Sequence, residues 1–179
     1  PKILDEYVMP HLQENRDVVL IVIDCLRLDQ WKSLEKILYG LFNVKTEFHL
    51  SLLPTATPFS RNAIFSGLYP DEFPKKFPNQ WEKMIRDETS MNRYESDFLK
   101  SYLQRNNLSQ ISMSYTKVVT PEDGRKFANH INEYKNTNLL ALVEHELQKN
   151  SPLSPLCRHL FWVGHPGSIF ANLGASPQA

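Results

Sequence analysis

Two segments of the sequence carry side chains that could act on a phosphate ester, and the first is Asp24. It follows directly after the apolar run VVLIVI at residues 18–23. In parallel α/β sheets, ligand sites lie outside the carboxyl ends of the strands, so a carboxylate at this position is well placed to hold a metal. The alternative is that Asp24 caps the helix expected to follow, a role that suits aspartate. On position alone the capping role is favoured.

The second segment is PTATP at residues 54–58. A strand is expected to end at Leu53 and a helix to begin near Pro58, because proline is favoured at the first helical position. Thr57 is then the N-cap, and the backbone N–H groups behind it form a site suited to a phosphate. A neighbouring divalent metal would lower the pKa of the Thr57 hydroxyl and make it a nucleophile. The alternative is a plain helix cap without chemistry.

The elements that must position these residues alternate between strands and helices. Residues 18–23 are apolar on both alternations, which is typical of a strand buried on both faces of a parallel sheet. The predicted strands are 17–24, 47–53, 109–119 and 137–144, and the predicted helices are 2–13, 28–42, 58–67, 79–87 and 94–106. The helix at 28–42 is expected to bury a stripe formed by Leu28, Trp31, Leu34, Ile37, Leu38 and Leu41. Gly67 is expected to end the helix at 58–67 in the left-handed conformation.

This order predicts an α/β fold with a mainly parallel sheet flanked by helices. Residues 1–15 are interpreted as a linker helix that leads in from an upstream region, because the chain begins at Pro1 without a methionine. Residues 16–150 are interpreted as the domain. From Ser151 onward acidic residues are absent and neither helical nor strand periodicity persists. Residues 151–179 are therefore either an irregular end of the domain or sequence that does not belong to it.

The composition bounds the function. The 20 basic and 20 acidic residues give a formal net charge of zero, so no basic field indicates nucleic-acid binding by bulk electrostatics. The two cysteines have no paired spacing, which indicates a reducing compartment. The longest apolar run is too short to span a bilayer, and the N-terminal residues lack the pattern of a signal peptide. A cytoplasmic location and no membrane contact are expected.

The segments IVIDCLR, at residues 21–27, and LPTATPFSRNAIFSGLYP, at residues 53–70, resemble the alkaline phosphatase superfamily. Its phosphodiesterase branch typically has an apolar strand that ends in Asp and then a Pro-Thr-x-Thr segment. The resemblance implies that Asp24 is a metal ligand, that Thr57 is both nucleophile and metal ligand, and that Thr55 is a supporting residue.

A closer resemblance is to the PglZ output domain of PorX-type response regulators. It covers roughly residues 1–143 and is strongest at 18–31 and 51–72. The resemblance implies an alkaline-phosphatase-like fold and a phosphodiesterase that uses two zinc ions to act on oligonucleotides or another phosphodiester. It also implies an upstream receiver domain and a cytoplasmic regulator linked to type IX secretion. A homodimer is one assembly that we expect.

The chain departs from this family after the segment NLLALV at residues 138–143. The family continues there into Asp and His ligands, whereas here no Asp occurs after Asp123. His145, His159 and His165 do not follow the family pattern, and we assign none of them as a ligand. We therefore expect a truncated domain with weak zinc binding and little activity. The alternatives are a non-enzymatic signalling module and an α/β domain that binds a phosphate ligand without cleaving it.

Overall fold

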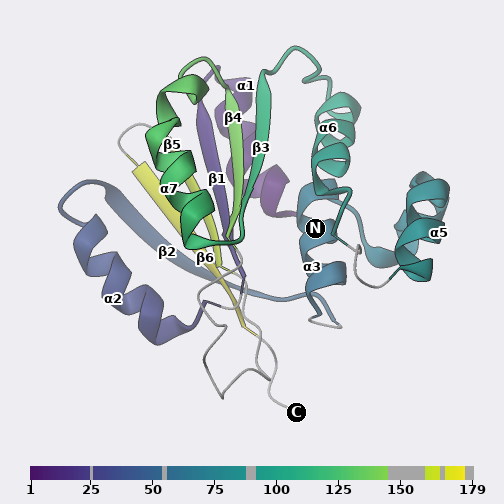
Figure 1. Cartoon of the computed structure of the whole chain (residues 1–179), viewed down its shortest axis with the longest axis horizontal. Coiled ribbons are helices and arrows are strands. Elements are labelled where there is room, and N and C mark those ends of the chain that lie inside the picture. The colour runs from purple at the N-terminus through teal and green to yellow at the C-terminus, as the bar shows by residue number, and fades with distance from the viewer. Residues whose placement is uncertain (25, 54–55, 88–91, 145–159, 166–167, 176–179) are drawn as a thin grey trace. The chain divides into compact units, whose positions relative to one another are not determined.

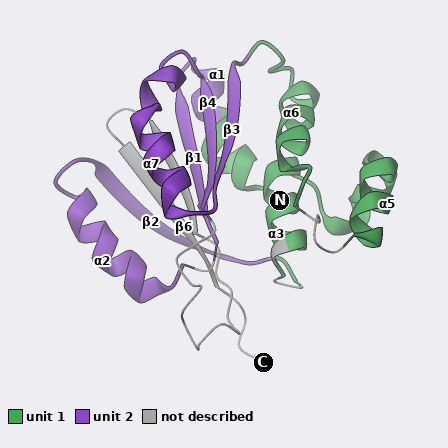
Figure 2. Cartoon of the chain, in the orientation of Figure 1, with its two compact units in different colours: residues 1–9, 52–110 green, residues 10–51, 111–179 purple. Residues whose placement is uncertain are grey.

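The computed structural model describes residues 1–24, 26–53, 56–87, 92–144, 160–165 and 168–175 (Figure 1). The chain divides into two compact units (Figure 2). Unit 1 contains residues 1–9 and 52–110, and unit 2 contains residues 10–51 and 111–179. No described helix is long and apolar enough to cross a membrane.

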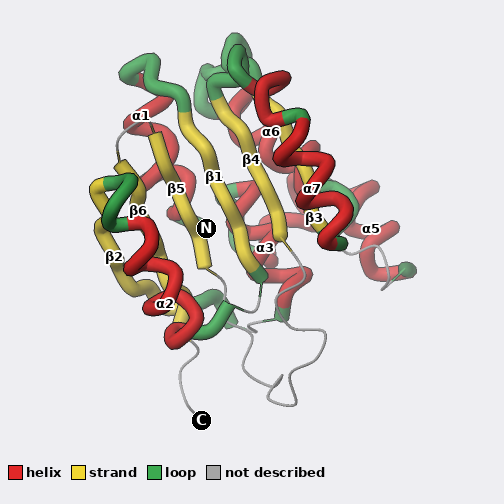
Figure 3. The backbone as a smooth tube through the Cα atoms, turned by 60° about the vertical axis from the view of Figure 1, so that its left-hand side comes forward, coloured by secondary structure: helices red, strands yellow, loops and turns green. Residues whose placement is uncertain are grey.

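Unit 2 is built on a six-stranded sheet with the order β2-β6-β5-β1-β4-β3 (Figure 3). The strands are β1 (Val18–Ile23), β2 (Asn43–Leu50), β3 (Met113–Val118), β4 (Leu139–Glu144), β5 (Leu160–His165) and β6 (Ser168–Ala175). Parallel pairing joins β1 to β4, β4 to β3, and β2 to β6. Strand β5 pairs antiparallel with both β1 and β6. The expected α/β fold with a parallel sheet flanked by helices is confirmed, with β1, β4 and β3 as its parallel core.

The two central parallel strands differ in how completely they are buried. The apolar residues of β4, Leu139–Val143, are all buried, as a strand covered on both faces should be. Strand β1 buries Val18, Leu20 and Val22, but Val19 is 37% exposed. The expectation that β1 is buried on both faces is therefore only partly correct.

Helix α2 (Leu28–Leu38) packs against β2 through Trp31. Trp31 is 2% exposed, and its indole N–H donates to Thr46 of β2 at 3.3 Å. Leu34 and Ile37, which were expected to face the core, are 39% and 68% exposed, and Leu41 beyond the helix is 72% exposed. Leu34 and Ile37 border a largely apolar cavity of about 250 Å³ between α2, β1 and β4. The predicted apolar stripe is thus only partly used for packing.

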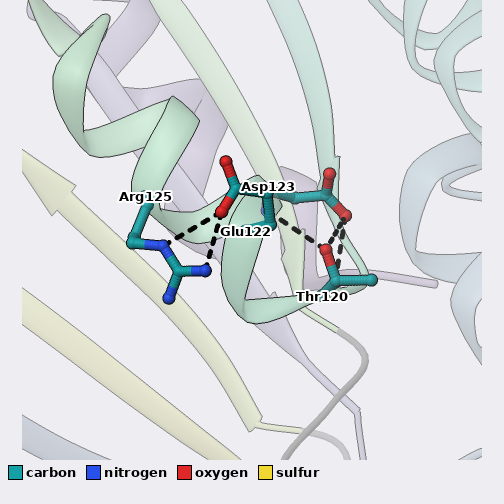
Figure 4. Close-up of polar contacts among 4 residues, drawn as sticks. All are labelled: Thr120, Glu122, Asp123 and Arg125. Atoms are coloured by element: carbon teal, nitrogen blue, oxygen red, sulfur yellow. Dashed lines mark hydrogen bonds and ion pairs between the residues drawn. The ribbon is translucent and has the colours of Figure 1, made fainter.

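Helix α7 (Pro121–Asn129) was not predicted, although its start carries a clear signal. The hydroxyl of Thr120 accepts a hydrogen bond from the backbone N–H of Asp123 at 3.1 Å (Figure 4). The carboxylate of Asp123 accepts one from the backbone N–H of Thr120 at 3.0 Å. This reciprocal capping box satisfies two backbone donors at the helix start. The guanidinium of Arg125 also contacts Glu122 at 2.7 Å on the exposed face.

The remaining elements of unit 2 are α1 (Met9–Gln13), most of which belongs to this unit, and η4 (Ile131–Tyr134). Helix α1 continues the π-helical turn η1 (Leu4–Val8) of unit 1, so the helix predicted at residues 2–13 is present and runs through Pro10. Its role as a linker stays a prediction. Strand β2 begins four residues earlier than expected, at Asn43. In the first half of β2, Val44 packs against Trp31 and Thr46 accepts a hydrogen bond from its indole N–H. Because the charged Lys45 and Glu47 alternate with these residues, the sequence did not indicate a strand there.

Strands β5 and β6 lie within residues 151–179, where the sequence showed no lasting periodicity, and neither strand was predicted. They occupy the sheet between β1 and β2. Whether this segment belongs to the native domain stays a prediction.

Unit 1 is helical. It contains η1, α3 (Thr57–Ser66), η2 (Pro70–Glu72), α4 (Phe73–Lys76), α5 (Pro78–Arg86) and α6 (Glu95–Arg105). Aromatic rings join α4 to α6, with the rings of Phe73 and Phe77 centred 5.3 and 4.7 Å from that of Phe98. The predicted helices at 58–67, 79–87 and 94–106 are confirmed as α3, α5 and α6.

Candidate functional site

Asp24 lies at the carboxyl end of β1, as the sequence predicted. Asp24 is 1% exposed, and its backbone N–H donates to the carbonyl oxygen of Glu144 at 3.0 Å. Because Ile23 stands opposite Glu144 in the parallel register, the ends of β1 and β4 lie at the same edge of the sheet. This is the edge where ligands bind in parallel α/β sheets.

The alternative role of Asp24 as a helix cap is wrong, because the N-cap of α2 is Arg27. The backbone N–H of Arg27 donates to the side chain of Gln30 at 2.9 Å. The Arg27 guanidinium donates to Asp29 at 2.9 Å, and this hydrogen bond lowers the pKa of the Asp29 carboxyl. Asp29 therefore pairs with Arg27 in the first turn of α2, where the helix dipole also stabilises a negative charge.

The carboxylate oxygens of Asp24 are ligands of the kind that zinc accepts from proteins. Asp24 therefore fits the metal that the sequence predicts. Its role as a ligand stays a prediction.

Helix α3 begins one residue earlier than expected. Its first residue is Thr57, Pro58 lies in the first turn, and the N-cap is Ala56 in an extended conformation. The prediction that Thr57 is the N-cap is thus off by one residue. Alanine has no side-chain oxygen, so Ala56 does not cap the helix with its side chain, and its carbonyl oxygen accepts from the backbone N–H groups of Phe59 and Ser60 at 3.0 and 3.1 Å. Thr55 and the side chain of Thr57 lie outside the described part of the structure, so their predicted catalytic roles stay predictions.

Further along α3, two polar residues were not identified from the sequence. Ser60 is 4% exposed, and its hydroxyl has no hydrogen-bond partner within the described part of the chain. It lies three residues after Thr57, which places both on one side of the helix. Arg61 is 2% exposed and forms a bidentate ion pair with Glu95 of α6, with both N–O distances at 2.7 Å. No local sequence signal connects these two residues.

The end of α3 confirms the sequence prediction. Gly67 has a φ of +66° and a ψ of +18°, the left-handed conformation that ends many helices. The backbone N–H of Leu68 then donates to the Ser66 hydroxyl at 3.1 Å. The helix that begins at Thr57 is therefore fixed in unit 1 both by its C-terminal turn and by the buried Arg61–Glu95 pair.

Asp24 belongs to unit 2 and Thr57 to unit 1. Their expected proximity stays a prediction. Among the described residues, no group of three or more His, Cys, Asp or Glu side chains could hold a metal ion. Structural and catalytic zinc sites usually contain at least three protein ligands. The described residues thus supply one fitting ligand, Asp24, and do not complete a zinc site. His145 and His159 lie outside the described residues, and only the backbone of His165 is described, in β5.

A family model described as the BREX system PglZ alkaline phosphatase-like domain matches residues 3–146, a range that includes both Asp24 and Thr57. Comparison with curated proteins found no match.

Proposed function

Because the chain belongs to the PglZ family of alkaline phosphatase-like domains, we propose that it derives from a metal-dependent phosphodiesterase. The substrate would be an oligonucleotide or another phosphodiester. The alkaline phosphatase-like proteins are generally metal-dependent, which supports zinc as the cofactor. The observation that carries the proposal is the buried Asp24 carboxylate at the shared edge of β1 and β4, within the matched residues.

Each site residue has a proposed role. Asp24 holds a zinc ion, Thr57 supplies the hydroxyl that attacks phosphorus and also binds metal, and Thr55 supports them. The positive end of the α3 dipole would attract phosphoryl oxygens, because a helix N-terminus favours anions. When bound, zinc supplies positive charge that favours the deprotonated hydroxyl and offsets the negative charge on the phosphoryl oxygens.

The biological setting is also a proposal. The resemblance of residues 1–143 to PorX-type regulators supports an output domain that receives a signal from an upstream receiver domain in the cytoplasm. Type IX secretion would be the process that it regulates. The helix formed by η1 and α1 would connect the two domains.

In this chain the activity is expected to be weak, because the described residues supply too few metal ligands for two zinc ions. The test is hydrolysis of bis(4-nitrophenyl) phosphate and of a short oligonucleotide by the 179-residue chain, with and without zinc. We expect at most slow, zinc-dependent turnover that is lost in Asp24→Asn and in Thr57→Ala. The matched control is Asp29→Asn, which changes a nearby acidic residue in the first turn of α2 that pairs with Arg27.

The outcomes separate the candidate functions. Turnover that is the same in Asp24→Asn and Thr57→Ala as in the unmodified chain would overturn the assigned site. Phosphate binding without zinc binding or turnover would favour the phosphate-binding domain, and the absence of all three would favour a signalling module. Rapid zinc-dependent turnover that Thr57→Ala abolishes would show that further ligands exist, and His145, His159 and His165 would be the first to replace.

A further inference from the structure

Strand β2 stands at one end of the six-stranded sheet. One of its edges pairs with β6 along all eight residues, Asn43–Leu50, and no strand in the described part of the chain pairs with the other edge (Figure 3). An edge strand of this length presents backbone donors and acceptors that another strand can use. Proteins usually protect such an edge, so the side chains of β2 indicate whether this edge is protected or adapted for pairing.

The two faces of β2 carry different side chains, because alternate residues of a strand point to opposite faces. On one face lie Val44, Phe48 and Leu50. Phe48 is 64% exposed and Leu50 is 79% exposed, although both belong to a regular strand. On the other face lie Lys45 and Glu47, which form an ion pair with each other and are 64% and 32% exposed. A lysine alone would protect the edge from pairing with another strand. Here a glutamate two residues further on can pair with the lysine of a second copy, so the charged face does not exclude a partner strand.

The sequence of β2 is complementary to itself when it is reversed. In an antiparallel pair of two β2 strands related by a two-fold axis at Thr46, Lys45 stands opposite Glu47 of the second copy. The same register places Val44 opposite Phe48 of the second copy. A two-fold axis repeats every contact, so the interface contains two of each pair. Opposite charges and apolar pairs directly across antiparallel strands are the stabilising combinations.

Other registers lose this complementarity. A shift that moves the axis to Lys45 places two lysines opposite each other, and a shift to Glu47 places two glutamates opposite each other. Like charges directly across a strand pair are destabilising. A shift that puts the axis between two residues aligns the apolar face of one strand with the charged face of the other. The register centred on Thr46 therefore satisfies both faces at once.

We propose that the free edge of β2 is a self-association surface, where a second copy of this chain adds its β2 antiparallel in the register centred on Thr46. The sheets of the two copies then become continuous. One strand pair buries less surface than the roughly 1,200 Å² of a small stable interface, so the dimer is weak and concentration-dependent. The proposal concerns unit 2 alone and does not depend on the phosphodiesterase function.

The test is sedimentation velocity on the full 179-residue chain at concentrations from about 10 to about 500 µM, the range suited to a small interface. The variants are Lys45→Glu, Glu47→Lys and the double variant that carries both changes. Either single change places like charges opposite each other at both repeated contacts. We expect each to raise the dissociation constant at least about tenfold, since two attractive pairs become repulsive.

The decisive sample is an equimolar mixture of the two single variants. The Lys45→Glu chain then presents two acidic residues to the two lysines of the Glu47→Lys chain, so heterodimers should form where neither variant self-associates. The double variant should dimerise like the unmodified chain, because the charges exchange positions. The matched control is Lys36→Glu, which changes an exposed lysine of α2 and should leave the dissociation constant unchanged.

Recovery in the mixture would also show that both single variants are folded. A chain that stays monomeric at the highest concentration would overturn the proposal. So would single variants that dimerise as well as the unmodified chain, because the contact would then lie elsewhere. Failure of both the mixture and the double variant to associate would contradict the register centred on Thr46.

Discussion

Arg61 and Glu95 lie 34 residues apart in the sequence and form a doubly hydrogen-bonded ion pair whose side chains are 2% and 0% exposed. The amide of Asn92 donates a further hydrogen bond to the same carboxylate at 3.0 Å. Helices α3 and α6 of unit 1 are thereby joined through a charge pair shielded from water. Since α3 begins at Thr57, this pair also holds the helix whose N-terminus we assign to the candidate site.

Replacing Glu95 with Gln should destabilise the protein strongly. The substitution leaves the Arg61 guanidinium buried without its carboxylate, and the removal of one partner from a buried ion pair typically costs about 3–5 kcal/mol. Urea unfolding at neutral pH measures the change in the free energy of unfolding. The control is Glu82→Gln in α5, which removes a solvent-exposed pair with Arg86 and should have little effect. Equal losses for the two variants would contradict the structural role of the buried pair.

Replacing Gly67 with Ala should also destabilise the protein. At the observed φ of +66°, a Cβ is unfavourable by about 1–2 kcal/mol. It would also lie 2.8 Å from two ring atoms of Tyr102, so that ring would have to move. The thermal midpoint or the urea midpoint reports the loss.

The matched substitution is Gly124→Ala in α7. There the new Cβ would meet only Val118 at an ordinary 3.7 Å, and alanine favours a helix over glycine by about 1 kcal/mol. We therefore expect the two glycine-to-alanine changes to have opposite signs. A neutral or stabilising Gly67→Ala would show that the left-handed turn after α3 is not required.

The stability of unit 2 should depend on the protonation of Glu35. Its carboxylate is 6% exposed and accepts hydrogen bonds from Lys32 at 2.7 Å and from Thr46 at 2.6 Å. The hydrogen bond from Lys32, followed by that from Thr46, holds the pKa of Glu35 below its usual value. Because the folded pKa is lower than the unfolded one, the stabilising contribution is present above the unfolded pKa. It is lost as the pH falls through the folded pKa.

The measurement for Glu35 is urea unfolding from about pH 7 to about pH 3, a range that spans the usual glutamate pKa of about 4.3. Glu35→Gln should be less stable than the unmodified chain at pH 7, and the difference should shrink on acidification. Thr46→Val removes one of the two hydrogen bonds to Glu35 and also the acceptor of the Trp31 indole N–H. Its loss of stability should therefore have one part that shrinks on acidification and one part that does not vary with pH. A difference between Glu35→Gln and the unmodified chain that does not vary with pH would contradict this account.

The sequence predicted features that depend on local chemistry. The apolar run before Asp24 specified a strand, and the position of Asp24 at its carboxyl end followed from that. Gly67 was predicted to be left-handed because glycine is the residue that most easily takes this conformation at the end of a helix. The capping box of Thr120 and Asp123 was an equally local signal, and α7 could have been predicted from it.

Features that depend on distant contacts could not be predicted in this way. The pairing of Arg61 with Glu95 depends on how α3 packs against α6, which no spacing reveals. Leu34 and Ile37 fit a helical stripe, yet both are exposed, whereas Trp31 of the same helix is buried and contacts Thr46 of β2. Nothing in the sequence at residues 160–175 predicted that β5 and β6 would enter the sheet. For the candidate site, the sequence located Asp24 at the correct edge but placed the cap of α3 one residue too late.

The most direct test of the proposed site is the zinc affinity of the 179-residue chain, measured by competition with a fluorescent chelator. The samples are the unmodified chain, Asp24→Asn, Thr57→Ala, the double variant and the Asp29→Asn control. If Asp24 and Thr57 bind the same ion, Asp24→Asn should raise the dissociation constant for zinc at least about tenfold. Even the loss of a residue that only hydrogen-bonds to a metal ligand weakens metal affinity by this factor. The losses of affinity in Asp24→Asn and Thr57→Ala should then be non-additive in the double variant, because two ligands of one ion are coupled, and Asp29→Asn should bind like the unmodified chain. Zinc binding that Asp24→Asn leaves unchanged would contradict the assignment of a PglZ-type metal site to this carboxylate.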